Sequence, residues 1–320
     1  MAIAAVCLLS CLSTAATAQS ISFDRLSLEE GLSQSNIFSF TQDSAGYLWM
    51  GTESAADRFD GHQIEAFRHD PADDNTITAG AVVDLHSPPD DQLWILTEDG
   101  VSHLDLATEI VTRAFEVEAT TNDPIFGTIG GLETFCEDHV IAVFSEQAWR
   151  VDGDTHKSQR LSFNGQQPKD RLTQPIRDNN GHVWLTDGHD LWRSNCETDT
   201  LDHKATWPDA TGLPEFGVSL LALTGLGDLA WAGADGIGII DTDTDQWRHT
   251  IRLEREVSAV ATDALGGLWV LTDQALIRAE LDETGESVRR WTTHIEHELP
   301  IDNFTNKPAL QTAQSGDGII

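Results

Sequence analysis

The chain has 320 residues and carries 53 Asp and Glu side chains against 19 Lys and Arg, which gives a formal net charge of -34. A surface of this charge repels nucleic acid and anionic lipid, so the composition excludes a nucleic-acid-binding protein and a protein of anionic membrane surfaces. The acids are spread along the chain rather than gathered in a tail, which indicates a solvated surface suited to a saline or extracytoplasmic setting.

The first 18 residues are apolar and small and contain no charged side chain. They end in Ala16-Thr17-Ala18, an A-x-A pattern before Gln19, and they therefore predict a secretory signal peptide over residues 1–18. No later segment has the length and apolarity of a transmembrane helix, so we expect no membrane insertion apart from the signal segment. The predicted localisation is periplasmic or otherwise extracytoplasmic.

A unit of short predicted strands begins at residue 36. Residues 36–42 alternate apolar and polar side chains, as a strand with one buried face does. Turn residues then separate three further predicted strands, over residues 47–52, 56–59 and 62–67. Asp60-Gly61 is a strong hairpin signal between the last two. The unit therefore predicts four antiparallel strands that follow one another in the chain.

Tryptophan recurs in the second strand of such units at steps of about 45 residues, or once about twice that. The residues are Trp49, Trp94, Trp184, Trp231 and Trp269. Aligning Trp149 with Trp192 places Ile141 where a further tryptophan would stand, so the repeat occurs six times. The pattern predicts an all-β fold, a β-propeller of four-stranded antiparallel blades with six complete blades and the start of a seventh. The tryptophans are expected to pack between blades.

The two ends of the chain suggest an interrupted repeat. Residues 20–27 resemble an outer strand without inner strands before it, and residues 313–320 resemble an inner strand and the start of the next. We therefore expect residues 19–320 to form one propeller domain that is incomplete at its C-terminus.

Two cysteines, Cys136 and Cys196, remain after removal of the predicted signal peptide. Both are expected at the same end of the propeller, and an oxidising compartment permits a disulfide between them. Their positions are not equivalent in the repeat, so the sequence favours two unpaired thiols.

Each unit also places an acid in the turn between its second and third strands, and antiparallel geometry brings these turns to one face of the ring. The acids are Glu53, Glu98, Asp99, Glu146, Asp187, Asp235 and Asp273. One interpretation is a site for Ca²⁺ or a hydroxyl-rich ligand, because carboxylate oxygens suit both. The alternative is that Asp and Glu are ordinary turn residues, which the sequence favours. Metal-ligand spacing, a P-loop and a nucleophile elbow are all missing from the sequence.

The segment Gln42-Asp-Ser-Ala-Gly-Tyr-Leu-Trp-Met-Gly-Thr52, with Gly31-Leu-Ser-Gln-Ser-Asn36 before it and Phe59-Asp-Gly61 after it, resembles the two-component regulator propeller repeat. The resemblance is strong over residues 20–75 and periodic to residue 293. It departs from the family at Ala55-Ala56, where Gly-Leu is usual. The resemblance implies an extracytoplasmic sensor of a membrane-spanning signalling protein, whose output is commonly a histidine kinase and sometimes a diguanylate cyclase.

On this interpretation the chain senses a ligand and has no catalysis of its own. The expected partner is a small molecule or a saccharide, with a homodimer as an option for the full-length sensor, and no cofactor other than Ca²⁺ is anticipated. One alternative is an enzyme similar to streptogramin lyases, whose repeats share the Asp-x-x-Gly-x-x-Trp pattern. Such an enzyme needs a His and a Glu that converge with a metal, and His189 beside Asp187 is the candidate here. Another alternative is a scaffold that binds only protein.

Overall fold

The protein is built almost wholly from β-strands in the part of the chain that the computed structural model describes. That part comprises residues 26–116, 130–136, 139–207, 220–233, 236–253, 257–263, 265–272, 275–282, 287–296, 314–315 and 318–319. Its helical structure is a single 3-10 turn, η1 (Leu28–Glu30). The predicted signal peptide lies outside the described residues, as does most of the predicted orphan strand at residues 20–27.

The strands form six main sheets, here called blades one to six, and a separate hairpin. Blade one holds β1 (Ile37–Gln42), β2 (Leu48–Thr52), β3 (Ala56–Phe59) and β4 (Ile64–Phe67), and blade two holds β5 (Val82–His86), β6 (Gln92–Thr97), β7 (Gly100–Asp105) and β8 (Ile110–Glu116). Blade three holds β9 (Gly130–Phe135), β10 (His139–Phe144), β11 (Gln147–Asp152) and β12 (Ser158–Arg160), and blade four holds β13 (Ser162–Asn164), β14 (Ile176–Arg177), β15 (Val183–Thr186), β16 (Asp190–Asn195) and β17 (Thr200–Thr206). Blade five holds β18 (Leu221–Leu223), β19 (Leu229–Gly233), β20 (Gly236–Asp241) and β21 (Gln246–Arg252), blade six holds β22 (Val257–Thr262), β23 (Leu268–Thr272), β24 (Ala275–Leu281) and β25 (Val288–Glu296), and the hairpin holds β26 (Gln314–Ser315) and β27 (Gly318–Ile319).

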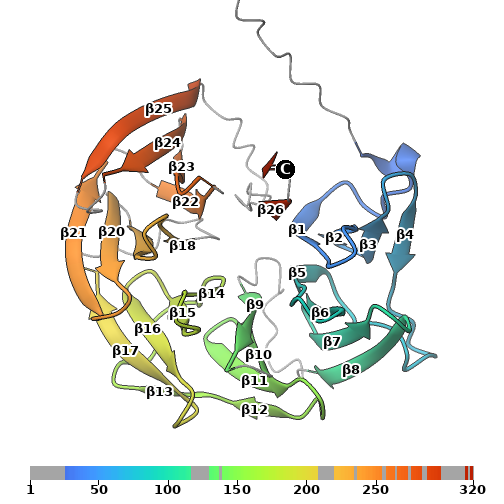
Figure 1. Ribbon diagram of the computed structural model, residues 1–320. Helices are drawn as coiled ribbons and strands as arrows, with labels where there is room; N and C mark the ends of the chain where they lie inside the picture. Colours follow the sequence, from blue (N-terminus) through green and yellow to red (C-terminus); the bar gives the residue numbers. More distant parts are fainter. Residues whose placement is uncertain are drawn as a thin grey trace, which may run out of the picture.

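The six blades stand around a common centre, with the first main strand of each blade innermost (Figure 1). The hairpin β26–β27 lies near the centre in this view. The predicted six-bladed propeller is confirmed, and the strands of blade one begin and end within two residues of their predicted bounds.

Blade four carries a fifth strand in addition to the four that the sequence predicts. The extra strand, β13, comes from the segment that links blades three and four, and it pairs in parallel with the outer strand β17. An outer strand leaves one row of backbone groups without partners, and the passing link satisfies some of them here.

A carboxylate in the turn before the second strand holds the tryptophan in place. In blade one, Asp43 accepts hydrogen bonds from the backbone N–H groups of Ala45 and Tyr47 and from Nε1 of Trp49 at 2.8 Å. The same arrangement recurs in the pairs Asp178–Trp184 and Asp263–Trp269. A glycine at positive φ allows each of these turns to close, namely Gly46, Gly181 and Gly266. The Asp-x-x-Gly-x-x-Trp pattern thus forms a hydrogen-bonded turn that holds the tryptophan side chain.

Blade five departs from the register predicted for its tryptophan. Leu223 pairs with Leu229 across β18 and β19, so Ala230 occupies the position of Trp49 and Trp231 comes one residue later. A slip of one residue turns a side chain to the other face of a sheet. Trp231 therefore packs back against blade four, whereas Ala230 faces blade six.

Apolar side chains fill the space between every two successive blades. Five such clusters lie among the described residues, each drawn mainly from two neighbouring sheets. Trp49, Trp94 and Trp184 are fully buried in three of them, and Ile141 takes the equivalent place in a fourth. Truncating such a buried aromatic side chain costs about 3–5 kcal/mol. The predicted role as wedges between blades is confirmed for Trp49, Trp94 and Trp184, whereas Trp269 is half-buried and belongs to none of these clusters.

In the described part of the chain, ion pairs join successive blades at the outer end of three junctions. In each, the arginine lies on the third main strand, directly across from the tryptophan position of the second. Its partner is a residue at positive φ in the next blade, in the hairpin between the third and fourth main strands. We call these inter-blade ion pairs: Arg58–Glu109 (2.8 Å), Arg150–Asp199 (2.9 Å) and Arg193–Asp245 (2.5 Å). The guanidinium groups of Arg58 and Arg193 also lie over the rings of Trp49 and Trp184, which adds cation–π attraction.

A disulfide links blades three and four. Cys136, in the turn after β9, is bonded to Cys196, in the turn after β16, with the two Cα atoms 5.7 Å apart. The expectation of two unpaired thiols is therefore wrong. The repeat positions differ, but neighbouring blades bring the two turns within disulfide reach.

Candidate functional site

The acids predicted for the ring face lie in the turns where the sequence placed them, as far as those turns are described. Glu53 and Glu146 are exposed, and Glu98 and Asp99 are half-buried. Burial raises the pKa of Glu98, and the charges of Asp99 and Glu53 add to the effect. Glu98 of blade two therefore lies near a carboxylate of its own turn and one of blade one. Asp235 and Asp273 lie outside the described residues.

The carboxylate of Asp187 is occupied by hydrogen bonds from backbone groups. It is fully buried, and its carboxylate accepts hydrogen bonds from the backbone N–H groups of Lys169, His189 and Asp190 at 2.7–2.9 Å. The half-buried His189 therefore meets Asp187 through its backbone rather than through its ring. Within the described residues, no group of three or more His, Cys, Asp or Glu side chains is arranged to hold a metal ion.

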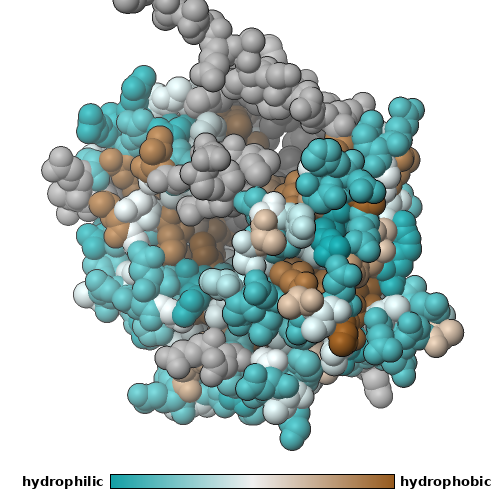
Figure 2. Space-filling model, turned by 45° about the vertical axis from the view of Figure 1, so that its right-hand side comes forward, coloured by the Kyte–Doolittle hydropathy of each residue, from teal (hydrophilic) through white to brown (hydrophobic). Residues whose placement is uncertain are grey.

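One face of the molecule is mostly polar. In the view of Figure 2 most of the described surface is hydrophilic, and apolar residues gather in few places. The helices of the described part include none that is long and apolar enough to cross a membrane. A small ligand would need a hollow in this surface, since a flat polar face offers little contact area.

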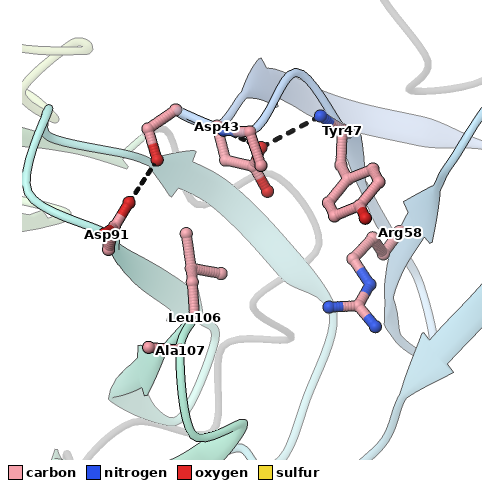
Figure 3. A pocket seen from close by; sticks show the side chains of 8 residues that line it. Asp43, Tyr47, Arg58, Asp91, Leu106 and Ala107 are labelled. Atoms are coloured by element: carbon pink, nitrogen blue, oxygen red, sulfur yellow. Dashed lines mark hydrogen bonds between the residues drawn. The ribbon is translucent and has the colours of Figure 1, made fainter.

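One such hollow, of about 210 Å³, lies at the junction of blades one and two (Figure 3). It is formed by the turn before β2, by the strand β3, by the turn before β6 and by the turn after β7. The lining residues are Asp43, Ser44, Ala45, Tyr47, Arg58, Asp91, Leu106 and Ala107.

The lining combines an aromatic ring, aliphatic groups and charged groups. Tyr47 is 38% exposed, and the guanidinium of Arg58 lies 5.4 Å from its ring centroid. Opposite them lies Leu106, and the hydroxyl of Ser44 donates to Asp91 at 2.5 Å across the junction. Such a mixture suits a small ligand with one apolar face and several polar groups. None of the residues predicted for the ring face lines this pocket, because its walls come from turns at other positions in the repeat.

A second cluster of polar residues lies at the inner edge of the junction between blades two and three. Asp84 is 3% exposed and accepts hydrogen bonds from the backbone N–H groups of Leu85 and Leu132. Burial raises its pKa to about 7, and burial likewise raises the pKa of Glu133 to about 7. Burial lowers the pKa of His86, whose Nε2 lies 3.8 Å from Glu133 and 2.8 Å from the hydroxyl of Thr134, to about 4.

Shifted pKa values of this kind mark a candidate functional region. The carboxyl groups of Asp84 and Glu133 would exchange protons near neutral pH. Sequence reasoning missed both, because the pairing of blade two with blade three is not visible in the alternation of a single strand. A charged residue at an inward position of an inner strand, Asp84 in Val-Val-Asp-Leu-His, is the signal that was available.

Residues 31–54 match the two-component regulator propeller repeat. The first blade therefore carries this repeat, which confirms the resemblance inferred from the sequence. Over 49 residues the chain is 41% identical to the histidine kinase P4 of Formosa agariphila, a match that covers 15% of this chain and 4% of the kinase.

Solved propellers share the fold. The extracellular domain assigned to a hybrid two-component system of B. thetaiotaomicron superposes with a TM-score of 0.61 at 14% identity, over 91% of this chain and 38% of that domain. Virginiamycin B lyase from Staphylococcus aureus superposes with a TM-score of 0.59 at 12% identity, over 81% of this chain and 84% of the lyase. At these identities the likeness shows the fold alone. The chain spans well under half of the sensor domain and a small part of the kinase that it matches.

Proposed function

We propose that this chain is the extracytoplasmic, ligand-sensing propeller of a membrane-bound signalling protein of the two-component type, and that it is not itself catalytic. The observation that carries the proposal is the two-component regulator propeller repeat at residues 31–54, placed as the first blade of a six-bladed ring. The similarity to a histidine kinase over 49 residues supports it. The lyase alternative gains no residue-level support, because Asp187 is already bonded on both carboxylate oxygens.

The disulfide supports an extracytoplasmic location. Disulfides persist in oxidising compartments and are rare in the reducing cytosol, and Cys136–Cys196 joins two blades. The apolar leader over residues 1–18 supports the same location. The test is a fusion of residues 1–40 to a reporter that is active only after export in a bacterial host. Export with a new N-terminus at Gln19 is expected, and a reporter that stays inactive in the cytoplasm would contradict the proposal.

The pocket between blades one and two is the proposed ligand site. Its aromatic ring offers an apolar face, while Asp91 and Arg58 offer an acceptor and a donor to hydroxyl or carboxylate groups. We propose a small polar molecule or a saccharide as the ligand.

The test is calorimetry of the full chain against a panel of soluble oligosaccharides and small carboxylic acids. Tyr47→Ala is expected to abolish the heat of any compound that binds. Trp291→Ala is the matched control, because this exposed aromatic residue of β25 lies in another blade. Binding that survives Tyr47→Ala would place the ligand elsewhere and leave the sensing role intact. A panel without any binding compound would count against the sensing role itself.

A further inference from the structure

The junction of blades two and three differs from three others at its outer end. Where those junctions hold inter-blade ion pairs, this one holds two histidines. His103 pairs with Trp94 across β6 and β7, as Arg58 pairs with Trp49 in blade one. His156 lies at positive φ in the hairpin between β11 and β12, as Glu109 does in the hairpin of blade two.

The two imidazoles are in contact. Their ring centroids are 4.9 Å apart, and both rings pack against Trp94, at 4.8 Å for His103 and 5.9 Å for His156. The Nε2 atom of each ring is buried and has no hydrogen-bond partner among the described residues. His103 as a whole is 9% exposed.

A positive charge on the imidazole of His103 would therefore be poorly hydrated. The charged groups that act on His103 are His156 from blade three, and Asp105 and Asp90 from its own blade. Burial lowers the pKa of His103 to about 4, and the nearby His156 adds to this, against the weaker attraction of the two aspartates. The inter-blade ion pairs of the other three junctions instead bring opposite charges together.

We propose that the junction of blades two and three is an acid-sensitive joint, in which protonation of His103, at its contact with His156 and Trp94, loosens the contact between the two blades. The neutral ring of His103 packs on Trp94 and on His156, whereas its imidazolium form would be a buried charge without a partner for its Nε2 proton. The three junctions that hold inter-blade ion pairs, at Arg58, Arg150 and Arg193, are expected to stay closed over the same range of pH. This inference does not depend on the ligand proposed above.

The direction of the effect follows from proton linkage. A histidine whose pKa is lower in the folded protein than in the unfolded chain contributes stability above pH 6.5, and that stability is lost as the pH falls toward 4. The opening equilibrium of this joint is therefore expected to rise about tenfold between pH 7 and pH 5. At the inner edge of the same junction, Asp84 and Glu133 change in the opposite sense, because they become protonated and neutral on acidification. His86, whose pKa burial also lowers to about 4, changes there in the same sense as His103, so the histidine variants at the outer end are needed to separate the two.

The experiment is hydrogen exchange of the full chain at pH 7 and pH 5, corrected for the intrinsic dependence of exchange on pH and read peptide by peptide. Backbone amides of β7 and β11 are expected to lose about tenfold in protection at pH 5. The hairpins of blades four and five, which hold Asp199 and Asp245, are the internal controls and should change less than twofold.

The decisive variant is His103→Arg/His156→Asp, which installs the ion pair found at Arg150–Asp199. It is expected to remove the extra exchange at pH 5. His156→Gln is the second variant, which takes away one titratable ring with little change in size, and it should reduce the effect even if the double variant fails to fold. Equal protection of β7 and β11 at both pH values in the wild type, or an unchanged loss in His156→Gln, would overturn the proposal.

Discussion

The carboxylate of Asp178 offers a direct measure of how much the turn motif stabilises a blade. It accepts hydrogen bonds from the backbone N–H groups of Asn180 and His182 at 2.9 Å each, and from Nε1 of Trp184 at 2.7 Å. Trp184 is fully buried between blades four and five, so its indole N–H has no access to water if the carboxylate is removed.

The substitution Asp178→Ala therefore has two costs. A buried donor left without a partner costs about 1–3 kcal/mol, and each of the two more accessible turn bonds contributes about 0.5–1 kcal/mol. We expect a loss of about 3 kcal/mol in the free energy of unfolding. Asp178→Thr should cost about half as much, because Thr224 holds the equivalent turn of blade five through bonds from Leu226 and Asp228 to its hydroxyl.

The assay is urea unfolding followed by tryptophan fluorescence, with the free energy taken at a constant slope against urea. The same substitutions in a Trp184→Phe background isolate the indole bond, because phenylalanine has no N–H group. In that background Asp178→Thr should be nearly neutral. A cost for Asp178→Ala below about 0.5 kcal/mol, or an equal cost for Ala and Thr, would refute this account of the motif.

Three further predictions concern the disulfide, a buried acid and the ring face. Reduction of the bond between Cys136 and Cys196, or Cys136→Ser, should cost about 4 kcal/mol for a sequence separation of 60 residues, and two reactive thiols in the unreduced protein would contradict it. Burial raises the pKa of Asp84 from 3.8 to about 7, so its contribution to the free energy of unfolding is present at low pH and is lost as the pH rises through 7. Asp84→Asn should therefore remove a decline of up to about 4 kcal/mol in the free energy of unfolding between pH 4 and pH 8, measured by urea unfolding. The same decline in the variant would argue against this account. We also propose that Ca²⁺ relieves the repulsion around Glu98, so excess CaCl2 should raise the melting temperature of the wild type more than that of Glu98→Gln; equal shifts would leave these acids as ordinary turn residues.

Much of the fold could be predicted from the sequence, because the repeat is local. Alternation and turn residues placed the four strands of blade one, and Ile141 was found by alignment alone. The register of Trp231 was missed because Thr224 replaces the turn aspartate of the motif. Trp231 therefore stands one position further along its strand than Trp49 does. The parallel strand β13 was missed because it depends on the path of a link across a sheet edge.

The candidate sites were harder to predict, because they form between blades. Tyr47 and Leu106 line one pocket although they belong to different repeats, and no pattern within a repeat reports their contact. Asp187 illustrates the converse error. Its place in the turn was right, but its oxygens are occupied by backbone donors, one of them from Lys169 in a distant link.

The inter-blade ion pairs all point the same way along the chain. At each, the guanidinium belongs to the earlier blade and the carboxylate to the later one. Each of these blades therefore offers both an arginine side chain and an apolar face to the blade that follows it in the chain. Contacts of this nearest-neighbour kind allow folding to start at one blade and spread to its neighbours. During synthesis the N-terminal blades emerge first, so we expect the blades to be added in order from the N-terminal side, each packing against the one before it.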